Sequence, residues 1–296
     1  MEITICKTAG LCAGAQRAYD GVIESLNKNP KTAVFKKILH NELLIEDLTN
    51  KGAKFCERLE DIGADDFVVL RAHGEEKQVY DYLKSKGINY KDSICVNVKR
   101  IHDLAIQKQN EGYNIIVVGT KKNGVLHDEI RGLISFLNSP IVVSNLKDVD
   151  DIEFDKDKKY FALCQSTFVS DLFEQIAKKI QDKAQAENIL VESQNTICGF
   201  TAYNKAESKK LAQESDIAIV VGSKNSSNTV EIYETAKAEC FTIFSNDFEE
   251  IKKLVLEYTK QHNIAIDNLK ICILAGASTL KENLQKLELQ LKFSLI

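Results

Sequence analysis

The 296-residue sequence has no long apolar run. A helix that spans a bilayer needs about 20 consecutive apolar residues, whereas the longest strongly apolar stretches here, such as 115–119 and 217–222, have the length of a strand. The first residues, MEITICKTAG, contain neither a basic cluster nor an extended apolar segment, so they read as a strand rather than a signal peptide. We therefore expect a cytoplasmic protein without a membrane partner.

A surplus of basic residues is also absent. The 39 lysines and arginines are outnumbered by 43 aspartates and glutamates, for a formal net charge of −4. This balance argues against a broad nucleic-acid-binding surface. Apolar residues make up 44% and charged residues 28%, which is typical of globular proteins and excludes disorder and a coiled coil.

The eight cysteines include no Cys-x-x-Cys pair, which argues against a zinc ribbon or a thioredoxin-type site. Cys12, Cys95 and Cys198 each stand just before a predicted helix, about one small α/β unit apart. A thiol at a helix N-terminus is stabilised as the thiolate, the form that binds metal. Spacing alone favours the other interpretation, that all three are small buried residues at turns. We interpret the other five as core residues: Cys6, Cys56, Cys164, Cys240 and Cys272.

Short apolar segments alternate with helical patterns along the whole chain, which predicts parallel or mixed sheets covered by helices. The predicted strands are 2–6, 34–39, 67–71, 115–119, 141–143, 160–164, 217–221, 241–244 and 271–275. The predicted helices are 14–27, 41–51, 75–86, 96–111, 128–137, 169–183, 203–214, 229–238, 247–261 and 279–290. With only two prolines and no Gly/Ser linker, domain boundaries are faint. The charged segment 147–160 is predicted to be a solvated loop, and 184–196 is a plausible domain junction.

Neutral hydrogen-bonding residues follow several of these strands, and ligands in open α/β sheets bind beyond the carboxyl ends of strands. The segments are His40-Asn41, RAHG at 71–74, QST at 165–167, GSKNSSN at 222–228 and GAS at 276–278. The small residues of 222–228 favour anion binding by backbone N–H groups at a helix start, although a helix N-cap with extra serines explains them equally well. His127 and Glu129 have the spacing of a proton-handling pair, but two solvated surface residues would have the same pattern.

Nine segments, taken in order, carry a more specific signal. They are GLCAG at 10–14, LHN at 39–41, AHG at 72–74, DSIC at 92–95, HDEIRG at 127–132, QST at 165–167, IC at 197–198, GSKNSSN at 222–228 and AGAS at 275–278. As an ordered set over nearly the whole chain, the segments resemble the 4-hydroxy-3-methylbut-2-enyl diphosphate reductase family, the last enzyme of the methylerythritol phosphate route to isoprenoids.

The resemblance implies an α/β fold of three similar α/β units, arranged with pseudo-threefold symmetry around a central 4Fe–4S cluster. The units would span residues 1–95, 96–195 and 196–296. Cys12, Cys95 and Cys198 would ligate the cluster. Three thiolates leave one of four irons open to act as a Lewis acid on the substrate's hydroxyl oxygen.

The reaction implied by the resemblance is a two-electron, two-proton reductive dehydroxylation that yields isopentenyl and dimethylallyl diphosphate. Glu129 matches the family's proton donor. Reduced ferredoxin or flavodoxin is the implied electron donor. The residues that match positions around the substrate, largely its diphosphate, are His40, His73, His127, Ser166, Thr167, Ser226, Ser227, Asn228 and Ser278.

Several positions depart from the family pattern. Asp128 replaces the usual proline between histidine and glutamate, and a second negative charge there would raise the pKa of Glu129 or repel the diphosphate. The segment before His127 is about four residues longer than usual, and an ungapped alignment would put Asn123 and Val125 at the histidine and glutamate positions. The other departures are DSIC for the usual Asp-Ala-Thr-Cys-Pro, Ser166-Thr167 for paired threonines, and GFTAYNKA after Cys198.

These departures leave other functions open. A divergent relative would keep the cluster and act on another substrate. A non-catalytic iron–sulfur or phosphate-binding sensor would have lost the acid, and a zinc hydrolase is a weaker rival. The feature that separates them is whether Glu129 reaches the cavity over the cluster.

Overall fold

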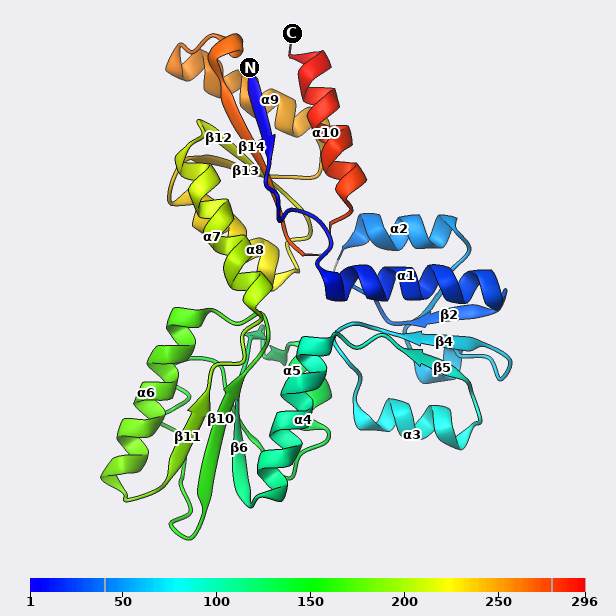
Figure 1. The fold of residues 1–296 in the computed structure, drawn as a ribbon, viewed down its shortest axis with the longest axis vertical. Helices are drawn as coiled ribbons and strands as arrows, with labels where there is room; N and C mark the ends of the chain where they lie inside the picture. Colours follow the sequence, from blue (N-terminus) through cyan, green and yellow to red (C-terminus); the bar gives the residue numbers. More distant parts are fainter. Residues whose placement is uncertain (40, 278, 296) are drawn as a thin grey trace. The chain divides into compact units, whose positions relative to one another are not determined.

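The structure is a computed structural model that describes residues 1–39, 41–277 and 279–295 (Figure 1). Its sheet strands are β1 (Glu2–Ile5), β2 (Thr32–Phe35), β3 (Lys54–Cys56), β4 (Phe67–Leu70), β5 (Tyr90–Asp92), β6 (Tyr113–Val118), β9 (Ile141–Val143), β10 (Lys159–Cys164), β11 (Val191–Gln194), β12 (Ile217–Val221), β13 (Phe241–Phe244) and β14 (Lys270–Ala275). Two short strands, β7 (Lys121–Lys122) and β8 (Val125–Leu126), form a separate antiparallel hairpin.

The helices are α1 (Ala13–Lys28), α2 (Glu42–Asn50), α3 (Lys77–Ser85), α4 (Val96–Asn110), α5 (Asp128–Ile134), α6 (Ser170–Ala186), α7 (Gly199–Gln213), α8 (Ser227–Lys237), α9 (Phe248–His262) and α10 (Lys281–Ser294), with 3₁₀ turns at Leu59–Asp61 and Ile266–Asn268. The chain divides into two compact units. The first comprises Met1–Gln16, Leu39–Asp47 and Gly199–Ile296, and the second comprises Arg17–Ile38 and Leu48–Cys198.

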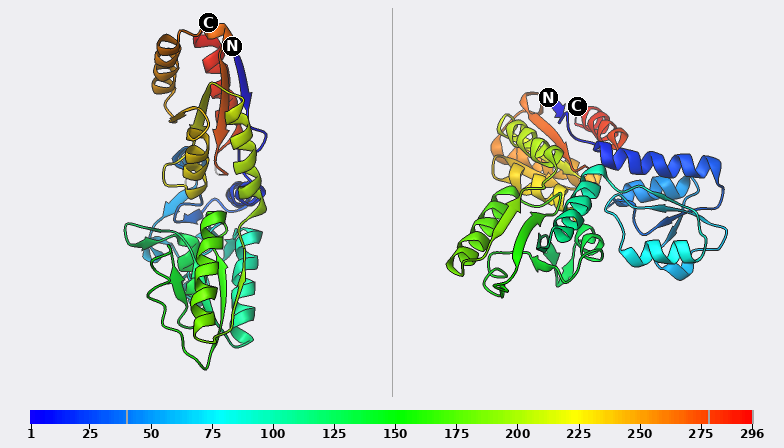
Figure 2. Two further views of the ribbon diagram at one scale, coloured as in Figure 1. Left: turned by 90° about the vertical axis from the view of Figure 1, so that its left-hand side faces the viewer. Right: turned by 60° about the horizontal axis from the view of Figure 1, so that its bottom comes forward.

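The first unit contains one parallel sheet with the strand order β1-β14-β12-β13. The chain crosses from β12 to β13 in one direction and from β13 to β14 in the other. Because such crossovers are right-handed, the connecting helices α8 and α9 cover opposite faces of the sheet, and Figure 2 gives two further views of them. β1, from the start of the chain, completes the sheet at the free edge of β14.

The second unit contains two parallel sheets with the orders β3-β2-β4-β5 and β9-β6-β10-β11. In both, the first strand along the chain lies between the second and the third, and the fourth is at an edge. The sheet of the first unit has the same order if β1 counts as its fourth strand. The described residues thus contain three α/β sheets of one topology, which confirms the predicted fold class of three similar α/β units.

The shared topology determines which loops lie at the ligand-binding edge of each sheet. In open α/β sheets, ligands bind beyond the carboxyl ends of the strands where the chain order reverses, and in each sheet here that point lies between the first and third strands. The loops on either side of that point follow β2 and β4, β6 and β10, and β12 and β14. Each polar strand end noted in the sequence belongs to one of these loops.

Some predicted elements were wrong or incomplete. The sheet strands β3, β5 and β11 and the hairpin strands β7 and β8 were missed. β11 lies within the segment 184–196 that was interpreted as a domain junction, and the boundary between the two units follows it at Cys198–Gly199. β1 pairs with β14, although the sequence grouped it with residues 1–95. The segment 147–160 is largely loop, but Val149 and Ile152 are buried in the core between β10 and α6.

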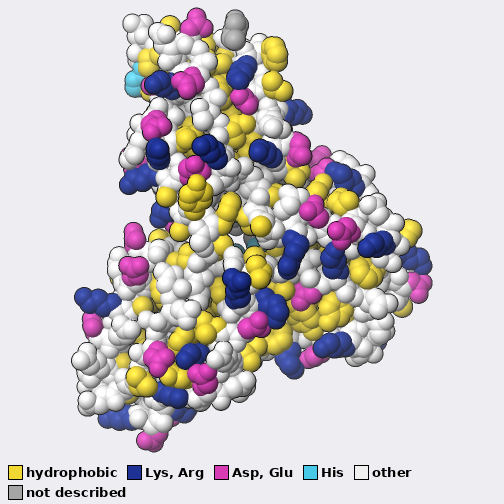
Figure 3. Space-filling model, viewed as in Figure 1, with side chains coloured by type: hydrophobic (Ala, Val, Ile, Leu, Met, Phe, Trp, Pro, Cys, Tyr) yellow, Lys and Arg dark blue, Asp and Glu magenta, His cyan; other side chains and the backbone are white. Residues whose placement is uncertain are grey.

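No helix among the described residues is long and apolar enough to cross a membrane. Acidic and basic side chains are interspersed over the face that Figure 3 shows, as the balanced composition predicts.

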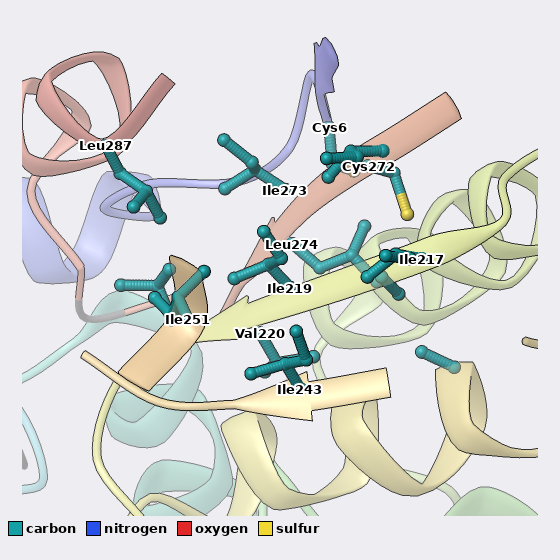
Figure 4. Packing of buried hydrophobic residues seen from close by; sticks show 14 of the residues in the cluster. Cys6, Ile217, Ile219, Val220, Ile243, Ile251, Cys272, Ile273, Leu274 and Leu287 are labelled. Carbon is teal, nitrogen blue, oxygen red and sulfur yellow. The ribbon is translucent and has the colours of Figure 1, made fainter. Parts of the chain in front are cut away.

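The cores are built from β-branched and small residues on both sides of each sheet. In the first unit, Ile219, Ile273 and Leu274 belong to one buried cluster with Ile251 of α9 and Leu287 of α10 (Figure 4). Of the five cysteines predicted to be core residues, Cys6, Cys56, Cys164 and Cys272 are buried, while Cys240 is half-buried.

Candidate active site

The three candidate cluster ligands occupy equivalent positions in the three sheets. Each cysteine follows a fourth strand and immediately precedes the first residue of a helix, α1, α4 or α7. Each cysteine N–H donates to a carbonyl that lies two residues beyond the third strand. These hydrogen bonds are Cys12 N to Ala277 O at 3.2 Å, Cys95 N to Ala72 O at 2.9 Å and Cys198 N to Ser166 O at 2.8 Å. The threefold recurrence in the sequence is therefore a structural repeat.

All three cysteines are free thiols of intermediate exposure. Each stands at the positive end of a helix dipole, which favours the thiolate. The Cys12 sulfur also accepts the N–H of Ala15, at 3.4 Å. These are the properties of metal-binding cysteines, whereas the alternative interpretation requires fully buried thiols at turns.

Within the second unit, two of the predicted ligands are linked through one side chain. Asn97 is the second residue of α4, two positions after Cys95, and its Nδ2 donates to Cys198 Sγ at 3.0 Å. Cys12 belongs to the first unit, so its approach to the other two stays a prediction. Inside either unit, the described residues contain no group of three or more His, Cys, Asp or Glu placed to hold a metal ion.

Glu129 lies in the first turn of α5 and is 2% exposed. Its Oε1 accepts the N–H of Ser166 at 2.7 Å, and its Oε2 lies 2.7 Å from Ser166 Oγ. Burial raises the pKa of Glu129 to about 7, although both hydrogen bonds from Ser166 act to lower it. A carboxyl in this state holds its proton close to neutral pH, as a general acid requires.

Two histidines of the second unit lie close to each other, and one of them contacts the backbone of Glu129. His127 is the N-cap of α5, and its Nδ1 accepts the N–H of Glu129 at 3.3 Å. In a neutral ring the proton must then lie on Nε2, which becomes the donor nitrogen. The His73 and His127 rings are 5.5 Å apart at 77°. The structure thus brings together His73, His127, Glu129 and Ser166, from RAHG at 71–74, HDEIRG at 127–132 and QST at 165–167.

Asp128 does not act as the sequence led us to expect. Its carboxylate forms ion pairs with Arg71 and Arg131. Burial alone would raise the pKa of Asp128, but the two guanidinium groups outweigh burial and hold it well below its usual range. The prediction that Asp128 raises the pKa of Glu129 was wrong, because burial of Glu129 causes that shift.

The extra residues before His127 form the β7–β8 hairpin. Asn123 and Gly124 have φ angles of 50° and 81°, as expected for a two-residue turn of type I′. The base of the hairpin is closed by the N–H of His127, which donates to Thr120 O at 2.9 Å. Asn123 and Val125 are exposed on the hairpin, whereas Glu129 is buried, which favours the gapped alignment. The assignment of His127 and Glu129 to the site stays a prediction.

The 222–228 loop belongs to the first unit. Ser226 is the N-cap of α8, and its Oγ accepts the N–H of Thr229 at 3.4 Å. Asn228 is 5% exposed, and its Nδ2 has no hydrogen-bond partner among the described residues. A buried amide donor without a partner is costly, which favours anion binding by this loop over the interpretation as an N-cap alone. Ser227 is half-buried beside these residues, while the candidates His40 and Ser278 lie outside the described residues.

A family model described as LytB protein matches residues 3–292. This chain belongs to the LytB family.

Relatives and solved structures of the LytB family match this chain over nearly its whole length. A 4-hydroxy-3-methylbut-2-enyl diphosphate reductase of Clostridioides difficile is 30% identical over 94% of this chain and 95% of its own. The same-named protein of Helicobacter pylori is 32% identical over 94% of each chain. The solved structure of the E-1-hydroxy-2-methyl-but-2-enyl-4-diphosphate reductase from Plasmodium falciparum superposes with a TM-score of 0.84 at 27% identity, covering 98% of this chain and 88% of that one. A solved structure described as the terminal enzyme of the non-mevalonate pathway gives 0.72 at 28% identity, covering 99% and 100%.

Two side chains of this LytB-family chain were missed as site residues. Gln165 is fully buried, and its amide accepts the N–H of Thr120 at 2.9 Å and donates to Thr167 Oγ1 at 2.7 Å, so it joins the loops that follow β6 and β10. The sequence signal that could have identified Gln165 was its position directly after β10, in the QST segment. Asn97 had no sequence signal, because its contact partner Cys198 is distant in the chain.

Proposed function

We propose that this LytB-family chain reduces 4-hydroxy-3-methylbut-2-enyl diphosphate to isopentenyl and dimethylallyl diphosphate. The reaction consumes two electrons and two protons, breaks the allylic C–O bond and releases the oxygen as water. The observation that carries the proposal is the buried Glu129–Ser166 pair, which places an acid with a pKa near 7 at the carboxyl ends of β6 and β10. Relatives of this chain that have a similar length are named as this reductase.

Cys12, Cys95 and Cys198 would hold a 4Fe–4S cluster. The donor set fits this group, because all three are free thiols at helix N-termini with the same backbone hydrogen bond. When bound, such a cluster supplies the electrons and a Lewis-acidic iron. We propose that the three α/β units correspond to residues 1–95, 96–195 and 196–296, with β1 completing the sheet of the last.

The remaining site residues bind the substrate and provide the proton. His73, His127, Ser166 and Thr167 offer hydrogen-bond donors, and Ser226, Ser227 and Asn228 surround the start of α8, where the helix dipole favours a diphosphate. The unpartnered Nδ2 of Asn228 would gain an acceptor there. His40 and Ser278 complete the proposed set. Glu129 gives up its proton as the C–O bond breaks and relies on Ser166 to hold the resulting carboxylate.

The proposal also includes a cytoplasmic location and reduced ferredoxin or flavodoxin as the electron donor. The intact acid favours an enzyme over a non-catalytic sensor, because a sensor has no need of a buried carboxyl with a raised pKa.

An anaerobic assay tests the proposal. The purified protein, reconstituted with iron and sulfide, is supplied with 4-hydroxy-3-methylbut-2-enyl diphosphate and dithionite, and we expect both isomeric products. A protein that carries the cluster and binds the diphosphate without turnover would instead be a sensor. A protein that carries the cluster and neither binds nor converts this diphosphate would be a divergent relative.

A further inference from the structure

Asn97 makes a contact that the reaction described above does not use. Its side chain, half-buried on the first turn of α4, places Nδ2 3.0 Å from Cys198 Sγ. The residue has little freedom to move away, since Val98 beside it is buried and the N–H of Lys99 donates to Cys95 O at 2.8 Å. The helix that starts at one predicted cluster ligand therefore delivers an amide to the sulfur of another.

The chemistry of the two groups determines which end of the amide faces the sulfur. A thiolate can only accept hydrogen bonds, so the amide must present Nδ2 rather than its oxygen. Cys12 differs, because its sulfur accepts a backbone N–H from its own helix. A backbone donor is the same for any side chain, whereas the donor to Cys198 depends on the residue at position 97.

We propose that Asn97 is a positioning residue that tunes the proposed cluster through Cys198, an inference that rests on the proposed function. Hydrogen bonds to ligating sulfurs, together with net charge and exposure, set the reduction potential of iron–sulfur clusters. A donor withdraws electron density from the sulfur and stabilises the reduced, more negatively charged state. Asn97 thus raises the midpoint potential and eases entry of the first electron.

The test is the midpoint potential of the cluster in an anaerobic redox titration followed by electron paramagnetic resonance. Asn97→Leu keeps the side-chain size and removes the donor. We expect its iron and sulfide content to match the wild type and its potential to become more negative, by about tenfold in the reduction equilibrium, which is about 59 mV for one electron. Asn97→Asp, which adds a negative charge at the same place, shifts the potential further in the same direction.

Asn110→Leu is the matched control, because it makes the same exchange at the exposed far end of α4 and leaves the potential unchanged. Asn97→Leu with a full cluster and a wild-type potential overturns the inference. If Asn97→Leu retains no iron, the variants Asn97→Ser and Asn97→Ala are compared. Iron that is retained with serine, which keeps a hydroxyl donor, and lost with alanine supports the role of Asn97. Equal iron content in these two variants refutes that role.

Failure of the proposed function and failure of the inference on Asn97 give different results. A wild-type protein that assembles no cluster refutes the proposed function and this inference with it. A wild-type protein with cluster and turnover, whose potential is indifferent to residue 97, refutes the inference alone.

Discussion

At the scale of single residues, Glu129 combines a buried carboxyl with the two hydrogen bonds of Ser166. Burial raises its pKa from the ordinary value of 4.5 to about 7. The proton-donating form is therefore abundant below pH 7 and is lost as the pH rises through that value. Turnover measured with a chemical reductant should fall above pH 7, and the fall should follow a single ionisation.

Glu129→Gln tests the same residue by substitution. The amide can accept the N–H of Ser166 and donate to its hydroxyl, so we expect iron content and substrate binding to persist while turnover drops by about 10²-fold or more. Because the raised pKa makes ionisation of Glu129 unfavourable in the fold, the wild type loses stability between pH 4.5 and 7, by at most about 3 kcal/mol. Urea unfolding at pH 5 and pH 8 should show this decrease in the free energy of unfolding for the wild type and not for Glu129→Gln. Unchanged turnover would remove Glu129 from its role.

Asp128 stabilises its surroundings without changing the acid beside it. Arg71 has only 3% of its side chain exposed, and it pairs with Asp128 and with the fully buried Glu75. Asp128→Asn leaves this guanidinium less well compensated, and we expect the free energy of unfolding at pH 7 to decrease by about 1–3 kcal/mol. The pH midpoint of turnover should stay where it is, because burial determines the pKa of Glu129.

Asp151→Asn, at an exposed position, is the control and should change neither quantity. A shifted pH midpoint in Asp128→Asn would mean that Asp128 acts on Glu129 after all. The stability that Asp128 provides is present at neutral pH and disappears only in strong acid, because the pKa of Asp128 is held below its usual range.

At the scale of elements, the β7–β8 hairpin is an insertion whose flanking residues lie next to each other. Thr120 and His127 are joined by a backbone hydrogen bond, so deletion of residues 122–125 would leave Thr120-Lys121-Leu126-His127 as a four-residue turn closed by the same bond. We expect the deletion variant to retain iron, turnover within about threefold and the same pH midpoint. Loss of turnover with iron retained would show that the hairpin itself contributes to the site.

The same elements explain what the sequence could and could not predict. The central strands were found because they are continuous apolar runs, such as Ile217–Val221. The missed strands β3, β5 and β11 are edge strands of three or four residues with sequences such as YKD and VESQ, in which apolar periodicity has no room to appear. Pairing of β1 with β14 joins opposite ends of the chain, which no local pattern encodes.

For the site, strand-end position pointed to His73 and Ser166, because polar residues after buried strands lie at the ligand-binding edge of their sheets. The assignment of His127 and Glu129 rested on the resemblance to the reductase family, since their spacing alone is typical of solvated surface residues. The ion pair of Asp128 with Arg71 and the contact of the Asn97 amide with Cys198 were not predicted, since each depends on a partner distant in sequence.

At the scale of the whole molecule, three sheets of one topology each provide a cysteine at the same structural position. Equivalent positions predict equivalent consequences. Cys12→Ser, Cys95→Ser and Cys198→Ser should each reduce the iron bound per chain to a small fraction of the wild-type value, because a cluster held by three thiolates loses a third of its protein ligands in each case. Iron and sulfide are measured after anaerobic reconstitution.

Cys240→Ser is the matched control, since Cys240 is a half-buried thiol between α8 and β13 rather than before a helix. It should bind as much iron as the wild type. If one of the three helix-start variants kept full iron while the other two lost it, that sheet would not contribute a ligand, and the structural repeat would be a feature of the fold alone. Equal loss in all three, with circular dichroism unchanged, is the result that only a shared cluster explains.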